Sequence, residues 1–295
     1  MDPLHILDID HLGALTANDK QRALTALEEG KVLYFPSYPF QFEDEEHHAL
    51  LTDKILDGKH KNLSFDYKSQ RLGGMNQQLD PGFINKLRHF MQGYAEYARE
   101  LLETAFPEYG QNLIWGRTSY RPAQISGRAS SKRKDDTRLH VDSFPATPVN
   151  GNRILRVFAN VNPYGEPRVW HLGEPFNDVA ERFASQIPKY NPVIAKLLHL
   201  IKATKTLRSA YDHYQLNLHD RMKLDDNYQQ TVNKQRFDFP PQSTWIVFTD
   251  QVSHAALSGQ FLLEQTFYLP VNGMKNPDLS PLKFWENKKT ALAPV

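Results

Sequence analysis

The stretch TWIVFTDQVSHAALSGQFLLEQTFYLP, residues 244–270, indicates the fold most directly. Two runs rich in β-branched, aliphatic and aromatic residues flank a short polar segment that contains His254, and such runs are typical of β-strands. We interpret the stretch as a strand, a tight turn, His254 and a second strand. This order predicts that one imidazole lies at the lip of a β-barrel.

A second short run, RLHVDSFP at residues 138–145, supplies a histidine and an aspartate two positions apart. Residues at i and i+2 of a strand point the same way, so His140 and Asp142 are expected to reach into one space. Taken alone this pair is weak evidence, because about one chance His-x-Asp match is expected in a chain of this size. The alternative is that Asp142 is a turn residue and His140 a buried core histidine.

Together the two stretches predict a metal site. Two histidines and one carboxylate, with the pair on one strand and the distal histidine on a later one, form the facial triad of non-haem Fe(II) enzymes. The triad leaves three positions on the metal open for a co-substrate and O₂. Other histidines suit the third position less well. His171 is expected in a Gly/Pro-rich loop. Three others lie on a helical stretch without a carboxylate partner (His199, His213, His219), and two lie in a charged run (His47, His48).

Two arginines are candidates for holding an anionic co-substrate such as 2-oxoglutarate. No Lys or Arg lies between His254 and Pro270, so the required cation is not on the strand that follows the distal histidine. Arg156, in RILRVFANVN, is flanked by apolar residues, and a buried arginine is costly unless it pairs with an anion. That anion is either the oxoacid or an internal carboxylate. Arg121 is the second candidate; it alternates onto one face with Arg117, so one arginine is available for the oxoacid and another for the substrate.

Composition excludes several classes of protein. The 295 residues include 35 Lys and Arg against 34 Asp and Glu, so nothing global indicates a nucleic-acid binder. The absence of cysteine excludes disulfides, zinc–thiolate sites and thiol nucleophiles. The first 13 residues are acidic and their apolar residues are interrupted, unlike a secretory signal, and no run is long enough to span a bilayer. We therefore expect a cytoplasmic protein.

The pattern along the chain predicts a single domain over residues 1–295. Residues 1–111 are expected to be mainly helical, with a capped helix at 18–29 and a long amphipathic helix at 83–106. From residue 112 short β-rich runs predominate, interrupted by a helical insertion at about 191–222 that starts with an Asn-Pro cap signal.

With these residues identified, the sequence resembles the Fe(II)/2-oxoglutarate-dependent oxygenases, and more narrowly the hydroxylases of 3-deoxy-D-manno-oct-2-ulosonic acid (Kdo). The resemblance extends from about residue 114 to 271 and rests on GRTSYRPAQISGR, TRLHVDSFPATP, RVFANVNP and FPPQSTWIVFTDQVSHA. It implies an α+β fold whose core is a double-stranded β-helix (a cupin-like jelly roll) buttressed by helices. It also implies that His140, Asp142 and His254 are the metal ligands and that Arg121 and Arg156 bind 2-oxoglutarate.

The resemblance further implies a reaction. Fe(II), 2-oxoglutarate and O₂ would be used to hydroxylate C3 of Kdo on Kdo-lipid A, with succinate and CO₂ as co-products. Two alternatives stay open. The chain is either a 2-oxoglutarate oxygenase acting on another small molecule or a protein, or a non-catalytic sugar-binding module of cupin type.

A Kdo-lipid A substrate is anionic and membrane-anchored, which suggests where contact with it occurs. We expect Arg117 and Arg138 to contact the substrate. The basic segment 126–138, with its lysines and arginine at 132–134, is expected to attract an anionic surface at the inner face of the inner membrane. Phe284 and Trp285, which lie among lysines, are expected to insert shallowly. The alternatives are a solvated loop and a tail that packs its aromatic residues on the barrel.

Overall fold

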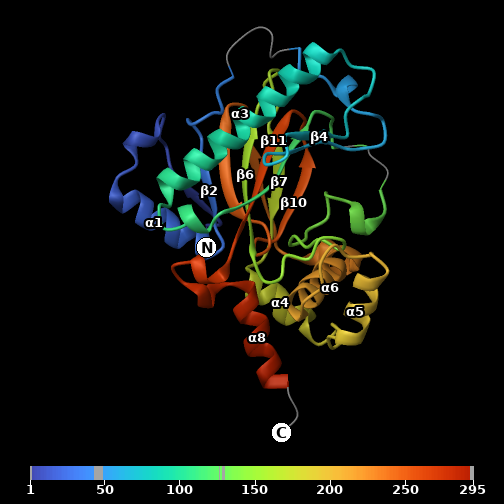
Figure 1. Ribbon diagram of the computed structural model, residues 1–295. Helices are drawn as coiled ribbons and strands as arrows, with labels where there is room; N and C mark the ends of the chain where they lie inside the picture. Colours follow the sequence, from blue (N-terminus) through green and yellow to red (C-terminus); the bar gives the residue numbers. More distant parts are fainter. Residues whose placement is uncertain (1, 43–48, 126, 128–129, 293–295) are drawn as a thin grey trace.

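The protein is described from a computed structural model, which covers residues 2–42, 49–125, 127 and 130–292. Its centre is a pair of β-sheets with helices on one face and at one end (Figure 1). This arrangement confirms the predicted jelly-roll core buttressed by helices.

The larger sheet has eight strands in the order β1-β2-β9-β6-β11-β5-β3-β4, and all its neighbours are antiparallel except β1 and β2. At its centre β6 and β11 pair along their whole length, because both are unbroken runs of strand-forming residues. The strands are β1 (Leu4–Ile6), β2 (Val32–Phe35), β3 (Leu63–Asp66), β4 (Arg71–Gly73), β5 (Ile114–Arg121), β6 (Arg153–Asn160), β9 (Ser243–Phe248) and β11 (Leu262–Leu269).

The smaller sheet has the order β10-β7-β8, formed by His254–Ser258, Arg168–Leu172 and Gln235–Phe239. An aromatic core joins the two sheets. Trp245 of β9 stacks on Phe239 of β8 with ring centroids 4.2 Å apart, and Trp170 of β7 meets Phe158 of β6 edge to face at 5.1 Å. Because these side chains come from both sheets, the space between the sheets is a packed barrel interior.

Two helices cover the opposite face of the larger sheet (Figure 1). Helix α1 (Ala17–Glu28) begins with a capping box between Thr16 and Asp19. Helix α3 (Pro81–Ala105) begins at Asp80, whose carboxylate accepts hydrogen bonds from the backbone of the first turn. Their apolar faces pack on alternate residues of β6, such as Leu155 and Val157. The other set of alternating β6 residues, which includes Arg156, therefore faces the barrel interior.

The remaining helices lie at one end of the strands (Figure 1). They are α4 (Phe176–Ala184), α5 (Pro192–Leu200), α6 (Ala210–Leu224), α7 (Asp226–Thr231) and α8 (Pro281–Leu292). The predicted insertion at 191–222 is thus two helices, α5 and α6, separated by a turn. No helix within the described part of the chain is long and apolar enough to cross a bilayer.

Two features differ from the sequence-based expectation. Residues 138–142 form an isolated bridge at His140 rather than a strand. His171 lies on strand β7 rather than in a loop, because the flanking Gly and Pro residues only delimit a short strand. The first 111 residues contain α1 and α3, and they also supply strands β1 to β4, which complete the larger sheet.

Candidate active site

His140, Asp142 and His254 come together in the barrel, although the second histidine is 114 positions beyond the first in the sequence. One potential ligand atom from each residue lies within 4.8 Å of the other two, and all three residues are buried. The backbones of His140 and His254 exchange hydrogen bonds of 3.0 and 2.9 Å. The backbone N–H of Asp142 donates to the carbonyl of Thr249 at 2.7 Å. The cluster is therefore fixed by main-chain pairing between two distant segments.

Backbone carbonyls determine which nitrogen each imidazole presents. His140 Nδ1 lies 2.8 Å from the carbonyl oxygen of Arg138, and His254 Nδ1 lies 2.8 Å from that of Val252. Because a carbonyl oxygen only accepts, Nδ1 carries the proton in both rings. In the neutral rings Nε2 then offers a lone pair, the form in which histidine binds metals.

The charge states also suit a cation. Burial lowers the pKa of His140 well below its ordinary value and lowers that of His254, so both rings are neutral near pH 7. Burial alone would raise the pKa of Asp142, but the Arg156 guanidinium and the other groups around this carboxylate together hold its pKa well below the usual range. Two neutral imidazoles and one carboxylate are the donor set of the facial triad.

Glu264, which the sequence analysis did not identify, pairs with both candidate arginines. Arg156 Nη1 lies 3.0 Å from Glu264 Oε1, and Arg121 Nη2 lies 2.7 Å from Glu264 Oε2. Arg156 also reaches the cluster, with Nη2 at 3.1 Å from Asp142 Oδ2. Burial would raise the pKa of Glu264, but the two arginines lower it, so this carboxylate is ionised. The internal carboxylate of Glu264 thus neutralises part of the charge on Arg156. This was one of the two alternatives for the anion that pairs with Arg156.

The residues of this site fit both a metal ion and an anionic co-substrate. The buried donors Arg156 Nε and Trp170 Nε1 make no hydrogen bond within the described chain, and Asp142 Oδ2 has no partner there besides its ion pair with Arg156. Buried polar atoms without partners are costly, so a ligand that supplies a cation and oxygen acceptors would relieve this cost. The donor set and the unpaired donors therefore match iron and an oxoacid.

Two aromatic residues complete the surroundings of the cluster. The Trp170 ring stacks on His254 with centroids 5.1 Å apart. His219 of α6, which was set aside as a third ligand, meets His140 edge to face at 5.5 Å and so lies beside the cluster. His171, next to Trp170 on β7, has its side chain on the other face of that strand. His199 and His213 lie on α5 and α6, and His47 and His48 lie outside the described residues.

The two arginines expected to contact substrate are both paired with acids of this chain. Arg117 Nη1 lies 3.3 Å from Asp66 Oδ2 on the neighbouring strand β3. Arg138 donates to the carbonyl of Lys223 and pairs with Asp226 at 2.6 Å. Their contact with substrate stays a prediction.

The expected membrane insertion of Trp285 is wrong, and the expected attraction by the basic segment is weakened. Trp285 is buried, its ring stacks on Tyr214, and its Nε1 donates to Gln215, so it is not available for insertion. The tail therefore packs its aromatic residues on the protein, which was the alternative.

Lys132 pairs with Asp226 and Arg133 with Asp220, which offsets their charge. Arg128 of the same segment lies outside the described residues.

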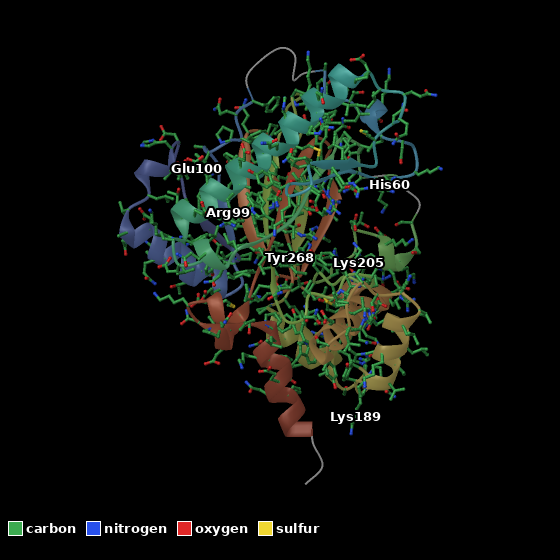
Figure 2. The ribbon with its side chains drawn as sticks, viewed as in Figure 1. His60, Arg99, Glu100, Lys189, Lys205 and Tyr268 are labelled. Carbon is green, nitrogen blue, oxygen red and sulfur yellow. The ribbon has the colours of Figure 1, made fainter. Side chains whose placement is uncertain are left out.

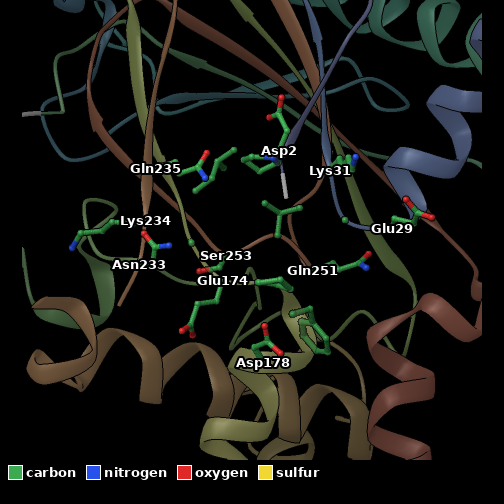
Figure 3. A pocket seen from close by; sticks show the side chains of 17 residues that line it. Asp2, Glu29, Lys31, Glu174, Asp178, Asn233, Lys234, Gln235, Gln251 and Ser253 are labelled. Carbon is green, nitrogen blue, oxygen red and sulfur yellow. The ribbon is translucent and has the colours of Figure 1, made fainter. Parts of the chain in front are cut away.

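Two pockets lie near the cluster. A pocket of about 190 Å³ is lined by Arg121, Lys61 and Asp136, so one candidate co-substrate arginine reaches a surface opening. A second pocket, of about 410 Å³, is lined by Ser253 but by none of the three cluster residues (Figure 3). Its charged lining is mixed, with four acids and two lysines, so it is not complementary to one kind of charged ligand (Asp2, Glu29, Glu174, Asp178, Lys31 and Lys234).

Comparison with known proteins agrees with this geometry. The family model of 3-deoxy-D-manno-oct-2-ulosonic acid (Kdo) hydroxylase matches residues 12–290. A comparison with curated protein sequences gave no match.

Solved structures give a close likeness. The crystal structure of the Kdo hydroxylase KdoO, a non-haem Fe(II) α-ketoglutarate-dependent dioxygenase, in complex with cobalt(II) is 46% identical, with a TM-score of 0.94 over 98% of this chain and 96% of that one. Its complexes with α-ketoglutarate and Fe(III), and with succinate and Fe(III), are 45% identical with TM-scores of 0.93 and 0.92 over the same shares of the chains. The buried cluster, the fold and these matches together lead to one conclusion: the chain belongs to the Kdo hydroxylase family.

Proposed function

We propose that this protein is an Fe(II)/2-oxoglutarate-dependent dioxygenase that adds a hydroxyl group to C3 of Kdo on Kdo-lipid A. The observation that carries the proposal is the buried cluster of His140, Asp142 and His254 in a chain that matches the Kdo hydroxylase family over residues 12–290. The same observation supports catalysis over the non-catalytic sugar-binding alternative, because an intact set of iron ligands has no use in sugar binding alone.

His140 and His254 would bind the iron through Nε2, and Asp142 would bind it through a carboxylate oxygen. When bound, Fe(II) with 2-oxoglutarate and O₂ supplies the oxidising chemistry, in which the oxoacid is decarboxylated to succinate and one oxygen atom enters the sugar. The protein holds the ligands in place through the carbonyls of Arg138 and Val252, which fix both imidazoles by their Nδ1–H groups.

Arg156 and Arg121 would bind the distal carboxylate of 2-oxoglutarate. Charge counting supports this role. The two arginines and the carboxylates of Glu264 and Asp142 sum to zero, since two positive charges meet two negative ones. Adding Fe(II) gives a buried charge of plus two, and the 2-oxoglutarate dianion returns the site to neutrality. Because uncompensated buried charge is costly, iron would favour binding of the oxoacid.

The surroundings of the cluster would keep water away from the reacting groups. Trp170, Phe158 and Trp245 fill the barrel behind it, and all three are buried. We assign the opening lined by Arg121 and Lys61 as the route of the sugar, because these two cations can pair with the Kdo carboxylate. Asp135 and Asp136 also line this opening, so its overall charge is balanced.

We also infer that the enzyme works at the inner face of the inner membrane, held by peripheral contact. The substrate that we propose is anchored in lipid, and the enzyme must therefore meet it at the bilayer surface.

The test is turnover of purified Kdo-lipid A. Incubation with Fe(II), 2-oxoglutarate and O₂ should release succinate and add one oxygen atom to Kdo, and fragmentation of the sugar should place that atom at C3. Succinate release with no change in Kdo, matched by turnover of another acceptor, would favour a different substrate for the same chemistry.

A further inference from the structure

Helix α5 makes little contact with the rest of the protein. Of its nine residues only Ala195 is buried. The helix nevertheless has sound ends of its own, since the Asn191 side chain accepts hydrogen bonds from the first turn and Pro192 occupies its first position. It is thus a formed helix whose sides are exposed.

The exposed residues of this segment are mainly large and apolar. Six of the eleven exposed large apolar side chains in the described chain fall within residues 193–207, with exposed fractions from 45% to 77%. They are Val193, Ile194, Leu197, Leu200, Ile201 and Leu207. A helix of a globular protein normally turns such residues toward the core, whereas a concentrated exposed patch marks an interaction surface.

The charge of the segment indicates what this patch contacts. Residues 182–211 contain no Asp or Glu, although acids and bases are nearly equal in number over the whole chain. Within the same segment Lys189, Lys196, Lys202, Lys205 and Arg208 accompany the apolar residues. Large apolar side chains edged by uncompensated cations are typical of helices that lie in the interface of an anionic bilayer.

The patch is joined to the active site by hydrogen bonds. The backbone N–H of Lys205 donates to the carbonyl of Ala146 at 2.9 Å, and Arg208 Nη2 donates to that of Pro145 at 2.7 Å. These two carbonyls lie three and four positions after Asp142. Figure 2 shows Lys205 on the side of the helical group nearer the strands and Lys189 at its far end. The turn after α5 is therefore attached to the chain segment that leaves the metal cluster.

We propose that residues 189–208, comprising α5 and the turn after it, are the membrane-docking surface and that their occupant is an anionic lipid bilayer. The apolar side chains enter the interface while the lysines contact lipid headgroups. This inference rests on the proposed function, since it gives the enzyme a place beside a lipid-anchored substrate. It also replaces the basic segment at 132–134, where two of the three cations are paired with acids.

The experiment measures sedimentation of the full chain with vesicles, without substrate or turnover. The vesicles are phosphatidylcholine with one quarter phosphatidylglycerol, and pure phosphatidylcholine is the uncharged reference. One variant is Leu197→Gln/Leu200→Gln; its control, Ile6→Gln/Ile114→Gln, alters two exposed apolar residues elsewhere. The second is Lys189→Gln/Lys196→Gln/Lys202→Gln; its control, Lys54→Gln/Lys59→Gln/Lys68→Gln, removes three exposed lysines elsewhere.

We expect the unaltered chain to bind the anionic vesicles and to bind them less as salt rises, because salt screens exposed charges. Each patch variant should weaken vesicle binding at least tenfold, whereas both control variants should bind normally. A tenfold loss is the effect of removing about two surface cations or one inserted apolar side chain. Equal binding by patch and control variants, or no binding by the unaltered chain, would overturn the proposal.

Two further measurements separate the other outcomes. If Leu197→Gln/Leu200→Gln converts a dimer to a monomer in sedimentation velocity and no variant binds vesicles, a second copy of the chain covers the patch and the lipid proposal is wrong. Turnover of detergent-dispersed Kdo-lipid A tests the enzymatic function separately. Normal vesicle binding without turnover would count against the proposed function alone, and normal turnover without vesicle binding would count against this inference alone.

Discussion

Replacement of Arg156 by methionine tests the co-substrate site in most detail. The guanidinium is buried and lies 3.0 Å from Glu264 Oε1 and 3.1 Å from Asp142 Oδ2. If it also binds the distal carboxylate of 2-oxoglutarate, its loss removes a charge-assisted contact of about 1.5–3 kcal/mol. The KM for 2-oxoglutarate should therefore rise roughly tenfold to a hundredfold. Arg156→Lys should recover part of the loss, because it restores the charge without the planar fork.

The same replacement should lower stability, since Arg121 would be the one cation left paired with Glu264 among the described residues. Removing one member of a buried ion-pair group costs about 3–5 kcal/mol. The assay is succinate release against 2-oxoglutarate concentration at saturating Fe(II), with urea unfolding measured in parallel. Arg236→Met removes an exposed arginine that pairs with Asp238 on β8, and should alter neither quantity by much.

One pattern of results would exclude these arginines from 2-oxoglutarate binding. If Arg156→Met and Arg121→Met both fold and both retain the normal KM for 2-oxoglutarate, then the two arginines serve only to neutralise Glu264 and Asp142. The oxoacid would then be held by other groups.

Three further predictions concern the cluster and its support. Mn(II) at a hundredfold excess over its Kd should stabilise the unaltered chain by about 2.7 kcal/mol and so raise its melting temperature. Asp142→Ala should fold but should lose this rise. An equal rise in both proteins would exclude Asp142 as a ligand. His171→Asn should keep normal metal affinity by calorimetry, because that ring lies on the other face of β7 from Trp170. Arg153→Met should lower the free energy of unfolding by about 3–5 kcal/mol in urea, because it strands the buried Asp250 carboxylate 2.7 Å away; a loss below 1 kcal/mol would contradict this account.

Much of the fold follows from sequence patterns that are local. Helix α3 was predicted from its apolar spacing, and the turn at Asp80 proved to be its first turn and cap. Strands β6 and β11 were predicted from runs of strand-forming residues. The RLHVD run misled because His140 pairs only with the distant His254, so that a bridge replaces the expected strand. Pairings between segments 114 residues apart leave no local signature.

In the candidate site, too, local patterns predicted some residues and missed others. The residue types and spacing were enough to select His140, Asp142 and His254, which the structure brings together, while their role as iron ligands stays a prediction. Glu264 was missed because a strand buried on both faces gives no sign of which polar residue points inward. The one available signal was the requirement of Arg156 for an anion, combined with the alternation of Leu262, Glu264 and Thr266 along β11.

The position of helix α5 was beyond sequence analysis for a related reason. Its apolar residues recur at the spacing of a helix that packs on a core, and the sequence alone does not show which surface covers them. The tail posed the opposite problem. Phe284 and Trp285 lie among lysines, as interfacial residues do, yet Trp285 is enclosed by α6 through Tyr214 and Gln215.

Hydroxylation of Kdo at C3 is tested by following the oxygen atom. The purified chain is incubated with Kdo-lipid A, Fe(II) and 2-oxoglutarate under heavy-isotope O₂, and the Kdo released by mild acid is analysed by mass spectrometry. The account predicts one labelled oxygen at C3 of Kdo, one succinate formed per sugar modified, and no product from Asp142→Ala. Kdo of unchanged mass, with the chain loaded with iron and converting 2-oxoglutarate, would contradict it.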